Sequence, residues 1–90
     1  MEALPKPLQP FVAVVVRTQR HAYGWSQEEL ALRMSVDPSE ISKLESGKRY
    51  SNLLTLQRVA QALDVSCSQL IWMAEMLQRR VEREEANMQE

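Results

Sequence analysis

The sequence predicts an all-α fold built from consecutive short helices. After Pro10 a single proline, Pro38, interrupts the chain, and apolar residues recur at intervals of three and four rather than two. Three predicted helix starts also share one plan: an apolar residue, a capping side chain, and a Glu or Gln three residues after the cap. Strands would instead require alternating apolar residues and abundant turn signals.

The first helix is expected just after Pro10, because proline is tolerated at a helix start and not in its interior. Segment 11–16 (FVAVVV) has the β-branched content of a strand. A lone strand could not satisfy its own backbone, however, so a helix is favoured there. On a helical wheel Val12, Val16 and Tyr23 share the core side, and Val14 points nearly opposite.

The capped starts locate the remaining helices. Ser26, Asp37 and Ser66 are the capping residues, with Pro38 at the first helical position of the second unit. They predict helices near 27–34, 38–46 and 67–82. A less clear start at Asn52 predicts another helix near 53–63.

Size and composition limit the chain to one small domain. It has 90 residues, 11 basic and 12 acidic side chains, a formal charge of −1 and 44% apolar residues. We expect a flexible arm over 1–9, a folded domain over 10–78 and a charged C-terminal extension over 79–90.

Several function classes are poorly supported. One cysteine, Cys67, and one histidine, His21, are too few for a disulfide framework or a metal site, so no metal and no cofactor are expected. The longest apolar run, 11–16, is far too short to span a membrane, which favours a soluble, cytoplasmic protein without a membrane partner. No phosphate loop or nucleophile elbow is present, so an enzyme is not expected.

Two capped starts lie only 11 residues apart, at Ser26 and Asp37. Two short helices joined by a tight turn describe a helix-turn-helix. On the second of them Ser39, Ser42, Lys43 and Ser46 share one face. Short polar side chains and a lysine allow a helix to approach a DNA groove closely, so we expect this face to contact DNA.

A cationic segment follows directly. Gly47 can end the helix in a left-handed conformation, and Lys48 and Arg49 come next. Together with Lys43 and Arg58 they give residues 42–58 a local excess of positive charge in a chain that is otherwise neutral or acidic.

These segments resemble the Cro and lambda-repressor-like helix-turn-helix family of transcriptional regulators. The resemblance covers roughly residues 11–74 and rests on three runs in the expected order: SQEELA from Ser26, ISKLESGKR from Ile41 and LQRVAQALDV from Leu56. It implies a compact five-helix domain, here with an extended C-terminal helix. It further implies that helix 38–46 enters the major groove of double-stranded DNA, usually as a homodimer on a two-fold symmetric operator.

The resemblance also assigns roles to individual residues. The residues expected at base edges are Pro38, Ser39, Ser42 and Lys43. Those expected at phosphates are Gln27, Ser46, Lys48, Arg49 and Asn52. Arg20 and Glu45 are expected to form a structural ion pair between the first and third helices, and to make no DNA contact.

Three positions depart from the family pattern. Ser35 replaces the glycine common in the turn, which predicts a strained or differently shaped turn. Ser51 replaces a frequent proline, which predicts a less rigid loop before the next helix. Glu40 adds a negative charge to the recognition helix, where a role in the capping box is favoured over acceptance of a hydrogen bond from cytosine.

The last helix carries apolar residues at helical spacing, and the first helix has more apolar residues than one core face needs. We expect residues 68–82 to form a dimer interface; the alternative is that this helix simply covers its own core. The interface residues proposed are Leu70, Met73, Leu77 and Val81. Trp25 and Trp72 are expected as staple and core residues.

A rival of a different class is a protein-interaction module, such as an antitoxin, co-activator or anti-repressor, that binds a protein partner through the last helix. The acidic tail and near-neutral charge favour it.

Overall fold

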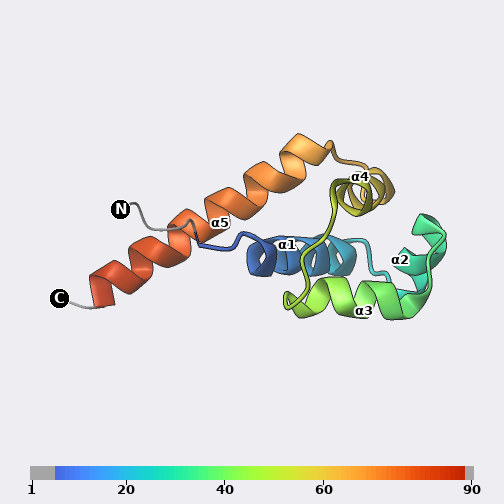
Figure 1. Ribbon diagram of the computed structural model, residues 1–90, viewed down its shortest axis with the longest axis horizontal. Coiled ribbons are helices and arrows are strands. Elements are labelled where there is room, and N and C mark those ends of the chain that lie inside the picture. The colour runs from blue at the N-terminus through green and yellow to red at the C-terminus, as the bar shows by residue number, and fades with distance from the viewer. Residues whose placement is uncertain (1–5, 89–90) are drawn as a thin grey trace.

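The computed structural model describes residues 6–88, which form five α-helices joined by short connections (Figure 1). The helices are α1 (Gln9–Ala22), α2 (Gln27–Met34), α3 (Pro38–Ser46), α4 (Leu53–Ala62) and α5 (Cys67–Met88). No strand occurs within these residues. The all-α prediction is therefore confirmed.

The helix bounds agree closely with the caps in the sequence. The predictions for α2 and α3 are confirmed residue for residue, and α4 ends one residue early. α1 begins at Gln9, so Pro10 lies inside its first turn instead of preceding it, and Gln9 is not part of the expected arm. α5 continues without interruption to Met88, well past the expected end at 82. Residues 1–5 of the expected arm lie outside the described residues.

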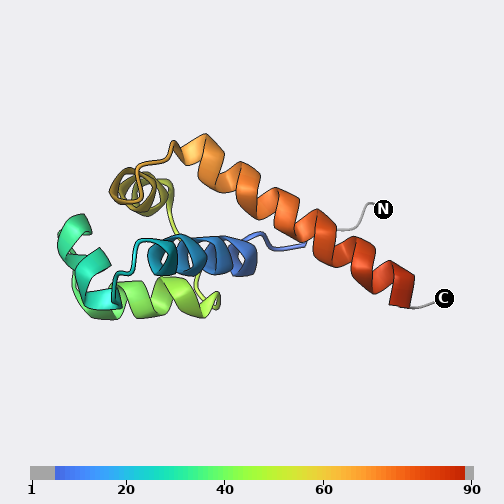
Figure 2. The same cartoon turned by 180° about the vertical axis from the view of Figure 1, so that it is seen from behind.

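The valine-rich segment is helical, as predicted. Val12 and Val16 are buried in the core, whereas Val14 points outward. α5 runs diagonally across α1, and it is the helix that packs most extensively on α1 (Figures 1 and 2). This packing covers Val15 within the same chain, whereas Val14 stays 37% exposed.

The core lies where α1, α2, α3, α4 and the first half of α5 meet. Its largest fully buried side chains are Leu30, Ile41, Leu63, Leu70, Val16 and Val59. The second half of α5 extends past the start of α1 in both views (Figures 1 and 2). There the Nε2 atom of Gln78 lies 3.4 and 3.5 Å from the carbonyl oxygens of Lys6 and Pro7.

Two aromatic predictions are wrong. Tyr23 is 46% exposed instead of belonging to the core, because its hydroxyl donates a hydrogen bond to the carbonyl of Leu63 at 2.8 Å and its ring stacks on Trp25. Trp72 is 60% exposed. It lies on the side of α5 opposite Leu70 and Ala74, the buried residues that face the core.

Candidate nucleic-acid interface

The α2–α3 unit is fixed by hydrogen bonds at its helix starts. Ser26 Oγ accepts from the backbone N–H of Glu29 at 3.1 Å, and Asp37 Oδ1 accepts from that of Ser39 at 2.8 Å. Hydrogen bonds from the backbone and the side chain of Ser39 hold the pKa of the Asp37 carboxyl below its ordinary value. Ser35 ends α2 at φ 56° and ψ 44°. This is the left-handed conformation that favours glycine, so the turn keeps its shape and Ser35 carries the strain.

α3 presents two contrasting faces. Ile41, Leu44 and Glu45 are buried against the rest of the domain. The four residues expected at base edges are all exposed: Pro38, Ser39, Ser42 and Lys43. The outward face is therefore free, polar and narrow, which is the form needed to enter a groove.

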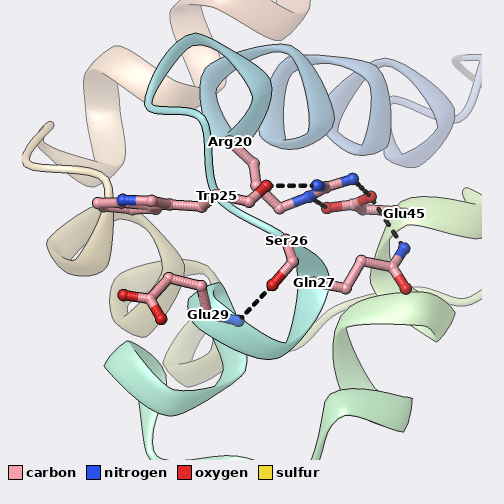
Figure 3. A network of polar contacts seen from close by, with 6 residues as sticks. All are labelled: Arg20, Trp25, Ser26, Gln27, Glu29 and Glu45. Atoms are coloured by element: carbon pink, nitrogen blue, oxygen red, sulfur yellow. Dashed lines mark hydrogen bonds and ion pairs between the residues drawn. The ribbon is translucent and has the colours of Figure 1, made fainter.

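The inward end of α3 is held by a buried ion pair (Figure 3). Arg20 donates from Nε to Glu45 Oε2 at 2.7 Å and from Nη2 to Glu45 Oε1 at 2.8 Å, and the two side chains are 8% and 3% exposed. Arg20 Nη1 also donates to the carbonyl of Trp25 at 2.8 Å. The pair thus joins α1, the α1–α2 connection and α3 in one network.

Opposing influences act on the Glu45 carboxyl. Burial raises its pKa, and this is the largest single influence. The hydrogen bonds from Arg20 and Gln27, with the charges of Arg20 and Arg17, together outweigh it, so the pKa of Glu45 lies below its ordinary value. The hydrogen bond to Glu45 raises the pKa of Arg20. Both groups are therefore charged in the folded protein.

Gln27 lies at the start of α2 and is bound into the same network. Its Nε2 donates to Glu45 Oε1 at 3.1 Å, which leaves the amide oxygen and one N–H uncommitted (Figure 3). No pattern in the sequence indicates this link. Any phosphate contact by Gln27 would therefore use a side chain that is already oriented by α3.

The segment after α3 bends sharply and exposes its cations. Ser46 Oγ donates to the carbonyl of Lys43 at 2.6 Å and accepts from the N–H of Lys48 at 3.2 Å. Gly47 has φ 72°, and a Cβ there would lie 3.2 Å from the Cα of Pro10. Both the left-handed backbone and the close approach of α1 thus require glycine. Lys48 and Arg49 are exposed beyond it.

The loop before α4 is tied to the start of α1. The buried side chain of Gln9 donates from Nε2 to Ser51 Oγ at 3.1 Å and accepts from the Ser51 N–H at 2.8 Å. Proline at position 51 could not donate this bond. The expected loss of restraint at Ser51 is therefore offset by a pair of hydrogen bonds. Asn52 caps α4 through Oδ1, at 2.8 Å from the Thr55 nitrogen, so its NH₂ group has no role in the cap.

Glu40 does not complete a capping box, and the prediction that it does is wrong. Its Oε1 lies 3.6 Å from Lys43 Nζ, and its Oε2 lies 3.6 Å from Arg49 Nη1. The reciprocal bonds of a complete box occur at α5, between Ser66 and Gln69. Glu40, Lys43 and Arg49 line a cavity of about 70 Å³ that also includes Tyr50, an exposed aromatic residue overlooked in the sequence.

The residues proposed for a dimer interface do not form one surface. Leu70 is fully buried (0% exposed), so its side chain belongs to the core of its own chain and is withdrawn from the interface. Met73, Leu77 and Val81 are half-buried and leave part of their surface accessible.

None of the helices within residues 6–88 combines the length and hydropathy that a membrane crossing requires.

Residues 16–70 match a protein family described as helix-turn-helix, HTH_3. The chain belongs to this helix-turn-helix family. Membership makes the matched region a DNA-binding module of transcriptional regulators of the Cro and lambda-repressor type.

A helix-turn-helix relative with a named role is the competence pilus inhibition repressor of Acinetobacter baylyi. It is 37% identical over 60 residues, which cover 67% of this chain and 54% of the repressor. The chain thus spans about half of that relative's length.

Solved helix-turn-helix structures share the whole fold. The clp gene regulator ClgR from Corynebacterium glutamicum superposes with a TM-score of 0.75 at 26% identity and covers 93% of both chains. The restriction-modification controller protein C.Esp1396I, as a tetramer in complex with its natural 35 base-pair operator, gives a TM-score of 0.71 at 26% identity, over 80% of this chain and 95% of that one. These matches show a lambda-repressor-like fold.

Proposed function

We propose that this regulator binds a specific, two-fold symmetric operator as a homodimer, with α3 of each subunit in the major groove. The observation that carries the proposal is the contrast between the two faces of α3, one buried and ion-paired, the other exposed and polar. The operator complex of C.Esp1396I supports it by resemblance. Two such helices would read half-sites whose centres lie about 10–10.5 base pairs apart, or a multiple of that.

Within this complex we assign the exposed side chains to two tasks. Pro38, Ser39, Ser42 and Lys43 read base edges, with Pro38 suited to a thymine methyl. The phosphates are held by Gln27, Ser46, Lys48, Arg49 and Asn52. The folded unit that binds DNA is 10–78, joined by Gln9 as the first residue of α1, and 79–90 is a charged extension.

Selection of operators from a random pool, followed by two lysine substitutions, tests the assignment. Lys43→Ala should lose about 1–3 kcal/mol of discrimination at one position of each half-site. Lys48→Ala should weaken all sequences alike and lower the slope of log affinity against log salt by about 1. Arg83→Ala removes an exposed cation from α5 outside the proposed dimer interface and is the matched control. Equal, sequence-independent losses for both lysines would remove Lys43 from base reading, and a chain that selects no sequence would refute the function.

The homodimer is proposed to form through the exposed parts of Met73, Leu77 and Val81. Val81→Asp should yield monomers, because it places a charge in the contact at a residue that is only partly buried. Sedimentation equilibrium measures this. Wild-type protein that remains monomeric at high micromolar concentration would refute the dimer.

One observation favours the protein-binding alternative. Trp72, an aromatic residue of α5, is 60% exposed, and exposed tryptophan is enriched at protein interfaces. If α5 binds another protein instead of a second copy, Trp72→Ala should leave the sedimentation of the isolated chain and its operator affinity unchanged.

A further inference from the structure

Two exposed carboxylates lie near the cations expected to contact DNA: Asp37, which is held by the backbone N–H of Ser39, and Glu40, which makes no capping bond. Residues 38–52 contain two acidic side chains, Glu40 and Glu45. Glu45 is buried and paired with Arg20, whereas the Glu40 side chain is 47% exposed. Any duplex that approaches α3 therefore meets Glu40.

Glu40 bridges two cations with different proposed tasks. Its two oxygens each lie 3.6 Å from a cationic nitrogen, one on Lys43 of α3 and one on Arg49 of the following loop. A distance of 3.6 Å is too long for a hydrogen bond, and all three side chains are about half exposed or more, so these pairs exchange readily. In the free protein, Glu40 thus holds the base-reading and the phosphate-binding cation near each other.

DNA would compete for the same cations. A phosphate that binds Arg49 must displace Glu40, and the released carboxylate then lies beside a polyanion without a partner. A carboxylate only accepts hydrogen bonds, and the partner it pairs with in the major groove is the N4 amino group of cytosine. A site without that group leaves the negative charge uncompensated.

We infer that Glu40 is a specificity-determining residue: it occupies Lys43 and Arg49 in the free protein and disfavours duplexes that offer no cytosine amino group near the start of α3. This inference rests on the proposed binding of α3 in the major groove. Glu40 weakens non-specific binding, and cytosine at one position of each half-site compensates its charge.

The test compares the full wild-type chain with Glu40→Gln on the selected operator and on a scrambled duplex of equal length. Glu40→Gln should bind the scrambled duplex about 5-fold or more tightly, because an amide leaves Lys43 and Arg49 free for phosphates. The ratio of operator to scrambled affinity should fall about 10-fold, within the range expected for one base contact. A repeated selection should lose the cytosine at one position.

Glu29→Gln is the matched control. It also removes one negative charge from a helix of the DNA-binding unit, its side chain is 41% exposed, and its partner is an arginine at 3.2 Å, here Arg33. It touches neither Lys43 nor Arg49. Equal effects of the two substitutions would mean that net charge alone matters, which overturns the inference.

An Arg49→Ala background tests the mechanism. Without Arg49, Glu40 keeps one cation fewer away from the DNA phosphates. The increase in affinity for the scrambled duplex that Glu40→Gln causes should therefore shrink to less than half. An undiminished gain overturns the bridging role.

The outcomes separate the two proposals. The wild-type chain could select an operator while Glu40→Gln keeps the same ratio of affinities and still selects cytosine at the same position. That result overturns the role of Glu40 alone. A wild-type chain that selects no operator overturns the proposed function itself. Far-UV circular dichroism of each variant confirms that the helices are intact.

Discussion

Glu40 and Glu45 lie five residues apart on α3 and have opposite environments. The Glu45 side chain is 3% exposed and accepts hydrogen bonds from Nε and Nη2 of Arg20 at 2.7 and 2.8 Å. Glu40 is 47% exposed and lies 3.6 Å from each of two cations. One helix thus carries a fixed carboxylate on its inner face and an exchangeable one on its outer face.

The difference shows how a small domain separates architecture from recognition. A buried charge must keep its partner, since an unpaired charge in the interior is strongly disfavoured. An exposed charge can change partners at little cost. Glu45 therefore fixes where α3 lies, and Glu40 influences what α3 binds.

The largest effect is expected from removal of the buried partner. Arg20→Ala should lower the free energy of unfolding by about 3–5 kcal/mol, because it leaves Glu45 charged and buried. It also leaves the carbonyl of Trp25 without its donor. Urea unfolding followed by circular dichroism measures the change.

Arg58→Ala is the control, since it removes the same charge from an exposed position of α4 that does not act on Glu45. It should change stability by no more than about 0.5 kcal/mol. A comparably small effect of Arg20→Ala would remove the distinction between the two faces of α3.

A smaller effect is expected from acid, because protonation of Glu45 leaves its shape in place. The pKa of Glu45 is lowered in the folded state, so its contribution to stability is complete above its unfolded pKa of about 4.3. The contribution is lost as pH falls through the folded pKa, and the lowered pKa of Asp37 acts in the same direction.

Urea unfolding at a series of pH values from 7 to about 2 tests this linkage. Stability should decline on acidification below about pH 4.3, and less steeply in Glu45→Gln than in the wild type. Identical slopes in the two proteins would show that Glu45 does not couple folding to proton binding.

The smallest effect on stability is expected at the outer pair. Arg49→Ala breaks a 3.6 Å contact with Glu40 between exposed groups and should cost at most about 0.5 kcal/mol. Urea unfolding measures it alongside Arg20→Ala. A loss of more than about 2 kcal/mol would mean that Arg49 stabilises the fold, and it would contradict the contrast between Glu45 and Glu40.

Local signals in the sequence were sufficient for the helix-turn-helix. Ser26 and Asp37 define the starts of α2 and α3, because a capping bond depends on residues only two or three positions away. The exposed positions of Ser39, Ser42 and Lys43 follow from helical periodicity alone.

Contacts between distant segments were not readable in the same way. Lys43 is a local partner of Glu40, three residues along α3, but Arg49 could be found as a partner only once the loop after α3 had brought it back toward the start of the helix. The bonds between Gln9 and Ser51 join residues 42 positions apart. Trp72 was misplaced because three-and-four spacing does not say which of two apolar sides of a helix is covered.

The end of α5 was missed for a related reason. Its last turns lack an apolar stripe, so periodicity indicated no helix beyond 82. Charged side chains can nevertheless support a helix through pairs one turn apart, such as Arg80 and Glu84, which lie 3.6 Å apart.

The length of α5 also has a mechanical consequence. Its 22 residues span roughly 33 Å at 1.5 Å per residue, and only its first half packs on the core. A bend of about 5° where this packing stops would move the free end by about 1.4 Å over the remaining half of the helix. If two copies dimerise through α5, small changes in its packing angle would alter the distance between the two α3 helices. They would therefore determine which half-site spacings the dimer can bind.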